Sequence, residues 1–341
     1  MHKRLALSAA ALICFSLALP LRSSAGTYVT FDIPGAKGAG IPQGINKWGT
    51  VTGYYTTTSG TYYGFLYQPS GTVTTFSVLA SKVSGTYPTS INDSGWIVGY
   101  FYDATGRHGF LRNPKYTVLD APGAGTANGQ GTQALSINNL GEIAGVFWDS
   151  SSVEHGFVRD GSGNYTTFDI PGGSAVMNAV LNQDGVVAGT YNVHTTGANY
   201  TYGYVMDTMG NITTFAVPGD VYGTSVVAIN SYGEVTGTYY PTVNPQEFLR
   251  DQFGNITTFN IAGYIWTAGI EDNADIVGTY KATNSNTRKG WQMTTAGTLS
   301  YFKDPSAGSQ GTYAWCVSGN GRIAGYYFDS VGAPHQFVEH N

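Results

Sequence analysis

A short motif recurs along almost the whole chain and restricts it to a repeat architecture. It is an apolar residue followed by Asn, by Gly three positions later, and by a second Gly four positions beyond that. The seven copies begin at Ile45, Ile91, Ile137, Leu181, Ile229, Ile270 and Val317. Their second glycines are spaced by 46, 46, 44, 48, 41 and 47 residues. Periods near 40 to 50 residues are typical of propeller blades.

Each repeat divides into four short apolar runs bounded by turn residues, as an antiparallel four-stranded blade requires. The third run always carries an aromatic residue. These residues are Phe65, Phe110, Phe157, Tyr204, Phe248, Trp291 and Phe337. The fourth run is Thr-Thr-Phe-Asp-Ile-Pro-Gly in its fullest form, at 166–172. The pattern predicts an all-β fold, a seven-bladed β-propeller of four-stranded antiparallel blades.

The two ends of the sequence complement each other. Residues 28–35 form a fourth-strand motif that precedes the first complete repeat, whereas the chain ends after a third-strand motif at 335–338. We therefore expect the N-terminal strand to complete the last blade, giving 28 strands in all. A linear solenoid is the alternative, but it would need polar capping repeats, and neither end has one.

Residues 1–25 have the features of a signal peptide. A basic start is followed by an apolar stretch and then by Ser23-Ser24-Ala25, a small-x-small cleavage signal. Pro20 and Arg22 interrupt the stretch, which argues against a membrane anchor. We expect residues 26–341 to be a single propeller domain, exported to the periplasm or the medium, without a membrane span.

Charge and cysteine content limit the partners. Cleavage would remove three of the 16 basic residues and none of the 21 acidic ones, leaving a net charge of −8. A nucleic-acid-binding surface needs clustered positive charge, so no nucleic-acid partner is expected. Only Cys316 remains after cleavage, at a position where other repeats have small residues, and we interpret it as buried filler.

Several motifs resemble the bacterial extracellular repeats called the HAF family. The third-strand motif fits at His108-Gly109-Phe110 and His155-Gly156-Phe157, and the Asp-Ile-Pro-Gly motif follows the second of these at 169–172. The sixth repeat departs, with Glu271 in place of Asn and Ala274 in place of the first Gly. The resemblance covers essentially the whole mature chain and implies a secreted bacterial repeat protein. It supplies no catalytic or binding residues to transfer.

The recurring residues favour structural roles. The asparagines at 46, 92, 138, 182 and 230 suit tight turns in which Gly takes positive φ, and the second Gly suits close packing between blades. The histidines at 108, 155 and 335 occupy one repeat position, and blades are too far apart for them to share a metal. Neither a metal nor a cofactor is expected.

The best binding candidates lie where the second strand of a blade meets the following loop. The aromatic residues are Tyr102, Trp148, Tyr240 and Phe328, and the acidic residues that follow three of them are Asp103, Asp149 and Asp329. Aromatic faces beside carboxylates suit stacking on sugar rings or contact with peptide side chains.

Site-like features are spread over the repeats, whereas a catalytic site would break their symmetry. The sequence therefore predicts a secreted, monomeric, non-enzymatic propeller that binds carbohydrate or protein through one face of loops. One alternative is a secreted glycosidase or lyase using acids of the fifth and sixth blades, for which Glu271 is the one asymmetry. Another is a purely structural surface protein.

Overall fold

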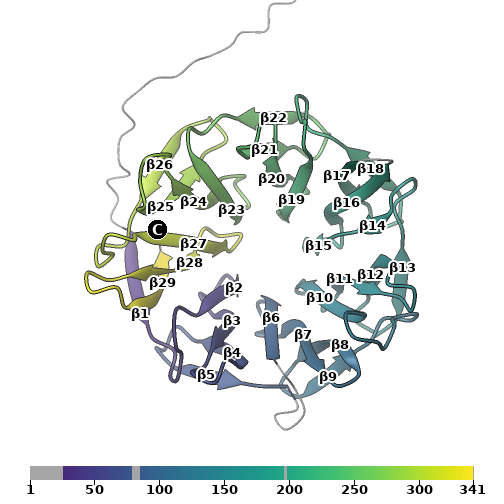
Figure 1. Cartoon of the computed structure of the whole chain (residues 1–341), viewed down its shortest axis with the longest axis horizontal. Helices are drawn as coiled ribbons and strands as arrows, with labels where there is room; N and C mark the ends of the chain where they lie inside the picture. Colours follow the sequence, from purple (N-terminus) through teal and green to yellow (C-terminus); the bar gives the residue numbers. More distant parts are fainter. Residues whose placement is uncertain (1–25, 79–84, 196–197, 341) are drawn as a thin grey trace, which may run out of the picture.

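The fold is built from β-strands arranged around a common centre (Figure 1). The structure is a computed structural model and describes residues 26–78, 85–195 and 198–340. The predicted signal peptide lies outside this range. Within the described residues there is no helix, and hence none long and apolar enough to cross a membrane.

The strands form five hydrogen-bonded sheets, one of which has 12 strands because single parallel bridges join successive groups of antiparallel strands. We divide the strands into successive antiparallel groups, called here units 1 to 7 in chain order, with β1 belonging to unit 7. The first strands are β2 (Ile41–Ile45), β6 (Gly85–Ile91), β10 (Gly131–Ile137), the pair β14 (Ala175–Val176) and β15 (Val180–Leu181), β19 (Thr224–Ile229), β23 (Tyr264–Ile270) and β27 (Thr312–Val317). Among them β6, β10, β15 and β19 lie close to the centre in Figure 1. The second strands are β3 (Val51–Thr56), β7 (Ile97–Asp103), β11 (Ile143–Trp148), β16 (Val187–Thr195), β20 (Val235–Tyr239), β24 (Ile276–Lys281) and β28 (Ile323–Phe328).

The outer half of each unit consists of its third and fourth strands. The third strands are β4 (Tyr62–Tyr67), β8 (Gly106–Arg112), β12 (Glu154–Arg159), β17 (Ala198–Met206), β21 (Gln246–Arg250), β25 (Arg288–Met293) and β29 (Pro334–His340). The fourth strands are β5 (Val73–Phe76), β9 (Tyr116–Leu119), β13 (Tyr165–Phe168), β18 (Ile212–Phe215), β22 (Ile256–Phe259) and β26 (Leu299–Phe302), and in unit 7 β1 (Thr27–Phe31).

Strand β1 pairs antiparallel with β29, from Thr27 opposite His340 to Phe31 opposite Gln336. The sheet order is β1-β29-β28-β27, so the N-terminal strand takes the fourth position of unit 7. A contact between residues about 300 positions apart thereby joins the two ends of the chain.

Unit 4 departs from the expected strand count because its first strand is interrupted. Between β14 and β15, the side-chain Oδ1 of Asn178 accepts the Thr190 N–H at 2.6 Å. The side chain thus replaces a main-chain pair, and the described residues form 29 strands rather than the predicted 28.

The third-strand aromatic residues form the core. All seven are fully buried, at 0% exposure, from Phe65 in unit 1 to Phe337 in unit 7. Burial of large apolar side chains is the main favourable term in folding, so the aromatic position predicted from the repeat supplies much of the packing.

The second glycine of each motif is crowded from within its own unit. A Cβ on Gly53 would lie 2.1 Å from the Ile41 carbonyl oxygen and 2.8 Å from the Phe65 ring. The first strand of unit 1 bulges between Pro42 and Gly44, next to this point. The prediction of close packing between blades was therefore wrong, because the crowding atoms belong to the adjacent first and third strands.

Candidate functional site

One end of the ring, called here the asparagine end, holds the turns between first and second strands. In unit 2 the Asn92 Oδ1 accepts the N–H groups of Ser94 and Trp96 at 3.1 and 2.9 Å. Gly95 in this turn has φ +76°, a left-handed conformation that suits glycine. These contacts confirm the turn role predicted for the recurring asparagines.

The same asparagines also link neighbouring units, which the sequence interpretation missed. Each Nδ2 donates to a main-chain carbonyl of the next unit, at 3.0 to 3.2 Å. The pairs run from Asn46 to Asn92, to Asn138, to Asn182, to Asn230 and on to Glu271. Unit 7 reaches unit 1 differently, since Asn320 Nδ2 and Arg322 Nε both donate to the Lys47 carbonyl.

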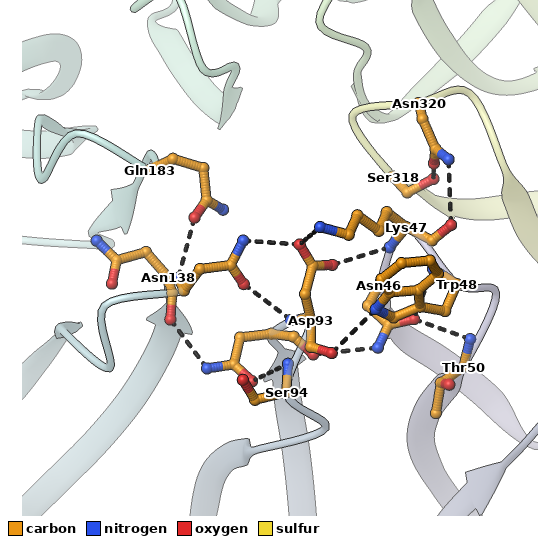
Figure 2. A network of polar contacts seen from close by, with 12 residues as sticks. Asn46, Lys47, Trp48, Thr50, Asp93, Ser94, Asn138, Gln183, Ser318 and Asn320 are labelled. Atoms are coloured by element: carbon orange, nitrogen blue, oxygen red, sulfur yellow. Dashed lines mark hydrogen bonds and ion pairs between the residues drawn. The ribbon is translucent and has the colours of Figure 1, made fainter.

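The residues that follow these asparagines add a second layer of contacts, shown in Figure 2. The Lys47 ammonium lies 3.2 Å from Asp93 Oδ2, which also accepts from Asn139 Nδ2 at 2.7 Å. The Asn139 N–H in turn donates to Gln183 Oε1. Polar groups at this end largely satisfy one another, which indicates a structural role.

A central cavity of about 500 Å³ opens among the first strands and the asparagine-end turns. Its wall includes Leu135, Ile137 and Val180, and its rim includes Lys47 and Asp272. Its charged residues are one cation, Lys47, and two anions, Asp93 and Asp272, and Lys47 is paired with Asp93, so the cavity has no concentrated charge.

The opposite end, called here the aromatic end, holds the loops between second and third strands, where the binding residues were predicted. Tyr102 and Trp148 come together there around Arg107. The guanidinium carbon lies 5.2 Å from the Tyr102 ring centre and 4.1 Å from that of Trp148. Arg107 Nε also donates to the Tyr102 hydroxyl at 3.1 Å.

The other two predicted aromatic residues lie apart from this pair. Phe328 packs against Tyr313 and Tyr326, with ring centres 5.9 Å apart in both cases. Tyr240 is held through its main chain, which bonds Asp220, Val221 and Tyr222. Within the described residues its ring joins none of the aromatic pairs.

The predicted acidic residues are engaged in the loops. Asp103, Asp149 and Asp329 accept hydrogen bonds from their own turns, chiefly from Thr105, Val153 and Ala333, and these bonds lower the pKa of each carboxyl. The structure thus brings together Tyr102 and Trp148, whereas the neighbouring carboxylates are hydrogen-bonded within their own turns.

Each of these carboxylates also faces a histidine that bonds a second aspartate. His108 lies 3.2 Å from Asp103 and 2.8 Å from Asp120. Equivalent triads join Asp149, His155 and Asp169, and Asp329, His335 and Asp32. The sequence held a signal, because the repeats with a third-strand His are those that carry both aspartates, but the contact between the motifs became visible only in the fold.

The aromatic end carries further rings on the inner strands that the sequence interpretation missed. In unit 2 the Tyr87 ring lies 5.0 Å from Tyr100 and 5.4 Å from Tyr54 of unit 1. In unit 7 the rings of Tyr313 and Tyr326 stack at 4.4 Å. We call the following set the aromatic belt: Trp266, Tyr313, Trp315, Tyr326, Phe328, Tyr54, Tyr62, Tyr87, Tyr100, Tyr102 and Trp148.

Three belt tyrosines, Tyr87, Tyr100 and Tyr326, keep their hydroxyl protons over the physiological range. Burial, and then the neighbouring tyrosines, raise the pKa of Tyr100 to about 12 and that of Tyr326 to about 12. The same causes, with burial the larger, raise the pKa of Tyr87. These hydroxyls therefore remain neutral groups able both to donate and to accept.

The belt covers only part of the ring. The position after the second Gly is Tyr54, Tyr100 and Tyr326 in units 1, 2 and 7, but Thr190 and Thr238 in units 4 and 5. This asymmetry was present in the sequence and was obscured there by aromatic residues that recur in every unit.

Comparison with known proteins gives the fold. The chain matches no family model and no curated protein sequence. It resembles the β-propeller domain of the Trilobed protease from Pyrococcus furiosus, with a TM-score of 0.60 and 11% identity over 89% of this chain and 94% of that one. The chain is a β-propeller.

Two further structures resemble this propeller at low identity. A streptogramin B lyase gives a TM-score of 0.58 and 12% identity, covering 92% of this chain and 98% of its own. An acylaminoacyl peptidase from Pyrococcus horikoshii gives 0.58 and 11%, covering 88% of this chain and 51% of its own. Identities this low establish the scaffold and no activity.

Acids of units 5 and 6 were the candidates for catalysis, and the structure places two of them inside the propeller. Glu271 is 5% exposed, and its Oε1 accepts from Gln292 Nε2 at 3.1 Å. Glu247 is fully buried, and its oxygens accept from the hydroxyls of Thr236 and Thr267 at 2.7 and 2.6 Å. Burial raises the pKa of Glu247 to about 8, so it is largely neutral at pH 7.

Other reactive groups offer little chemistry. Cys316 is a buried free thiol whose pKa is raised by burial, which agrees with its interpretation as filler. In the described part of the chain no cluster of three or more His, Cys, Asp or Glu residues could hold a metal ion.

Proposed function

We propose that this chain is a secreted, non-enzymatic, seven-bladed propeller that binds carbohydrate through the aromatic belt. The seven units are its blades. The β1–β29 pairing and the contact between Asp32 and His335 at 2.7 Å support closure of the ring by the N-terminal strand. Export rests on the N-terminal segment, whose composition is that of a signal peptide.

The observation that carries the proposal is the belt itself. Trp266 and Trp315, on the first strands of neighbouring units, remain 47% and 36% exposed. Flat apolar rings left open to solvent beside neutral hydroxyls suit sugars, whose rings have apolar faces and hydroxyl rims. Trp315 occupies the bulge of β27, so the belt reaches from the loops toward the centre of the ring.

Binding can be tested with the protein purified after expression with its own leader. We expect one class of oligosaccharide in a diverse panel to raise the melting temperature, because a ligand of the native state stabilises it. Calorimetric titration should then show that Trp266→Ala weakens this sugar about tenfold, which corresponds to about 1.4 kcal/mol.

Trp48→Ala is the matched control. Trp48 is 58% exposed but lies in an asparagine-end turn, where its Nε1 donates to the Asp93 carbonyl. The Trp48→Ala variant should bind the sugar as tightly as the unaltered protein does. If no sugar binds, or if both variants lose binding equally, the belt is not a carbohydrate site and a protein partner becomes the better hypothesis.

A further inference from the structure

Two belt-lining arginines occupy the same position in different blades. Arg107 in β8 and Arg288 in β25 each begin the four-residue third-strand motif of their units. The other units have Tyr62, Glu154, Thr201, Pro245 and Pro334 at this position. A cation therefore recurs only in units 2 and 6, near the two ends of the belt.

The main chain holds both arginines in the same way. The N–H of Arg107 donates to the Gln130 carbonyl and that of Arg288 to the Gln310 carbonyl, both at 3.1 Å. The glycine after each glutamine pairs in parallel with the arginine.

Those two glycines cannot be replaced without disturbing the arginine. Gly131 and Gly311 have φ of +110° and +84°, and a Cβ on either would lie 1.9 Å from the arginine carbonyl oxygen. A Gln-Gly-Thr sequence precedes or begins the next first strand in these two places alone, at 130–132 and 310–312. The two sites share a backbone design as well as a side chain.

Tyrosine hydroxyls orient both guanidinium groups. Arg107 Nε donates to Tyr102 at 3.1 Å, and Arg288 Nη1 donates to Tyr313 at 2.9 Å. A neutral partner positions the group without cancelling its charge. Arg107 Nη1 is buried without a hydrogen-bond acceptor, a costly state that a ligand oxygen could relieve.

Charge distinguishes these sites from their surroundings. In the described structure neither guanidinium forms an ion pair with a carboxylate, although acidic residues outnumber basic ones by 21 to 16 in the whole chain. Arg107 acts electrostatically on the carboxyl of Glu154, which lies opposite Trp148 on β12. Burial outweighs that attraction and raises the pKa of Glu154 to about 7, so it offsets the arginine only in part at neutral pH.

We propose that the aromatic belt binds an acidic polysaccharide and that Arg107 and Arg288 each receive a sugar carboxylate. The inference rests on the proposed carbohydrate function and names its substrate class. A guanidinium matches the planar carboxylate with paired N–H donors, while the neighbouring rings contact the sugar. Sulfate esters could supply the same negative charge, so the test separates the two sources.

The test is calorimetric titration with three ligands: an oligogalacturonate, the same oligosaccharide with its carboxyl groups reduced to alcohols, and a sulfated neutral oligosaccharide. We expect the oligogalacturonate to bind at least about tenfold more tightly than either of the others, since hydrogen bonds to charged groups exceed neutral ones. Its affinity should fall as salt rises.

Arg107→Gln and Arg288→Gln should each weaken the oligogalacturonate about tenfold and leave the reduced sugar unchanged. Arg112→Gln is the matched control, because Arg112 lies on the same strand as Arg107 but contacts Phe76. This variant should bind the oligogalacturonate as tightly as the unaltered protein does. Arg107→Lys retains the charge but loses the fork, and should fall between Arg107→Gln and the unaltered protein. Melting temperatures verify that all variants are folded.

The two proposals fail in different ways. If the reduced sugar binds as tightly as the oligogalacturonate and the arginine variants change nothing, the belt is a neutral-sugar site and only this inference is overturned. Tighter binding of the sulfated sugar would overturn the assignment to carboxylate. If none of the three ligands binds and the broader panel also fails, both proposals fall.

Discussion

At the asparagine end almost every unit makes the same contact, whereas at the aromatic end the side chains change from unit to unit. Five successive asparagines donate to the next unit, and Asn46, Asn92 and Asn138 are all at most 5% exposed. At the aromatic end, tyrosines in units 1, 2 and 7 give way to threonines in units 4 and 5, and tryptophans remain open to solvent.

The difference separates two kinds of repetition. A hydrogen bond that links each blade to the next in the same way recurs from blade to blade, and its polar groups are satisfied within the protein. A ligand touches some blades and not others, so residues for it need not recur. Departure from the repeat is therefore the better guide to binding in this fold.

The largest predicted effect is at the asparagine end. Asn92→Ala should lower the free energy of unfolding by about 2 to 3 kcal/mol, because the N–H groups of Ser94 and Trp96 lose their acceptor and the bond to the Asn138 carbonyl of unit 3 is removed. Urea denaturation measures the loss. Asn320→Ala, which removes an exposed contact to Lys47, should cost less than about 0.5 kcal/mol, and equal losses would contradict the assigned role.

A smaller gain is expected in unit 6. Ala274 replaces the usual glycine of the turn and has φ +65°, so the turn of the departing sixth repeat is kept with a strained residue. Ala274→Gly should raise the free energy of unfolding by roughly 0.5 to 1 kcal/mol, the relief of strain being partly offset by chain entropy. Thermal denaturation measures it.

A residue at the aromatic end allows the stability gain expected for Ala274→Gly to be compared with a second case of positive φ. Ser152, with φ 63°, lies in a loop at the aromatic end, where its hydroxyl accepts from Gln130 Nε2. Ser152→Gly should raise the free energy of unfolding by less than Ala274→Gly does, because the hydrogen bond from Gln130 is lost. A larger gain at Ser152 than at Ala274 would show that backbone strain does not determine the difference.

The smallest predicted effect is on how the free energy of unfolding depends on pH. His335 and His340, near the two ends of β29, should contribute to this dependence with opposite signs. Burial favours the neutral form of His335, but bonds to Asp32 and Asp329 outweigh it and raise its pKa above 6.5. Its stabilising contribution is thus complete below pH 6.5 and is lost as pH rises through the raised pKa. His340, at the asparagine end, has its pKa lowered by burial and by Arg322, so it destabilises the fold as pH falls below 6.5.

Denaturation of His335→Gln and His340→Gln between about pH 5 and 8 should separate these contributions, each about 0.5 kcal/mol. Relative to the unaltered protein, His335→Gln should lose most at acid pH, whereas His340→Gln should gain there. The same sign for both variants would refute the assignment.

Much of the fold could be predicted from the sequence repeat. The seven buried third-strand aromatics and the positive φ of Gly95 and its counterparts were predictable, because each requirement is local and recurs. The interrupted first strand at Asn178 was not, since it depends on one side chain reaching Thr190 across the sheet.

The candidate site was predictable only in part. Tyr102, Trp148 and Phe328 were identified from their place before the loops, but Tyr87, Tyr313 and Arg107 were not. Their significance lies in contacts between strands and between units, such as Arg107 of unit 2 against Trp148 of unit 3.

By itself the sequence determined the repeat, the strand order within a unit, the turn glycines and the buried aromatic position, because those follow from steric and hydrophobic requirements along a single strand or hairpin. Only the tertiary structure decided which side chains of neighbouring repeats meet across the ring. It thereby decided that each of three histidines lies between two aspartates of its own unit, and that aromatic residues of several units form one belt beside two arginines. These contacts depend on distances between strands and between blades, which no spacing along the chain specifies.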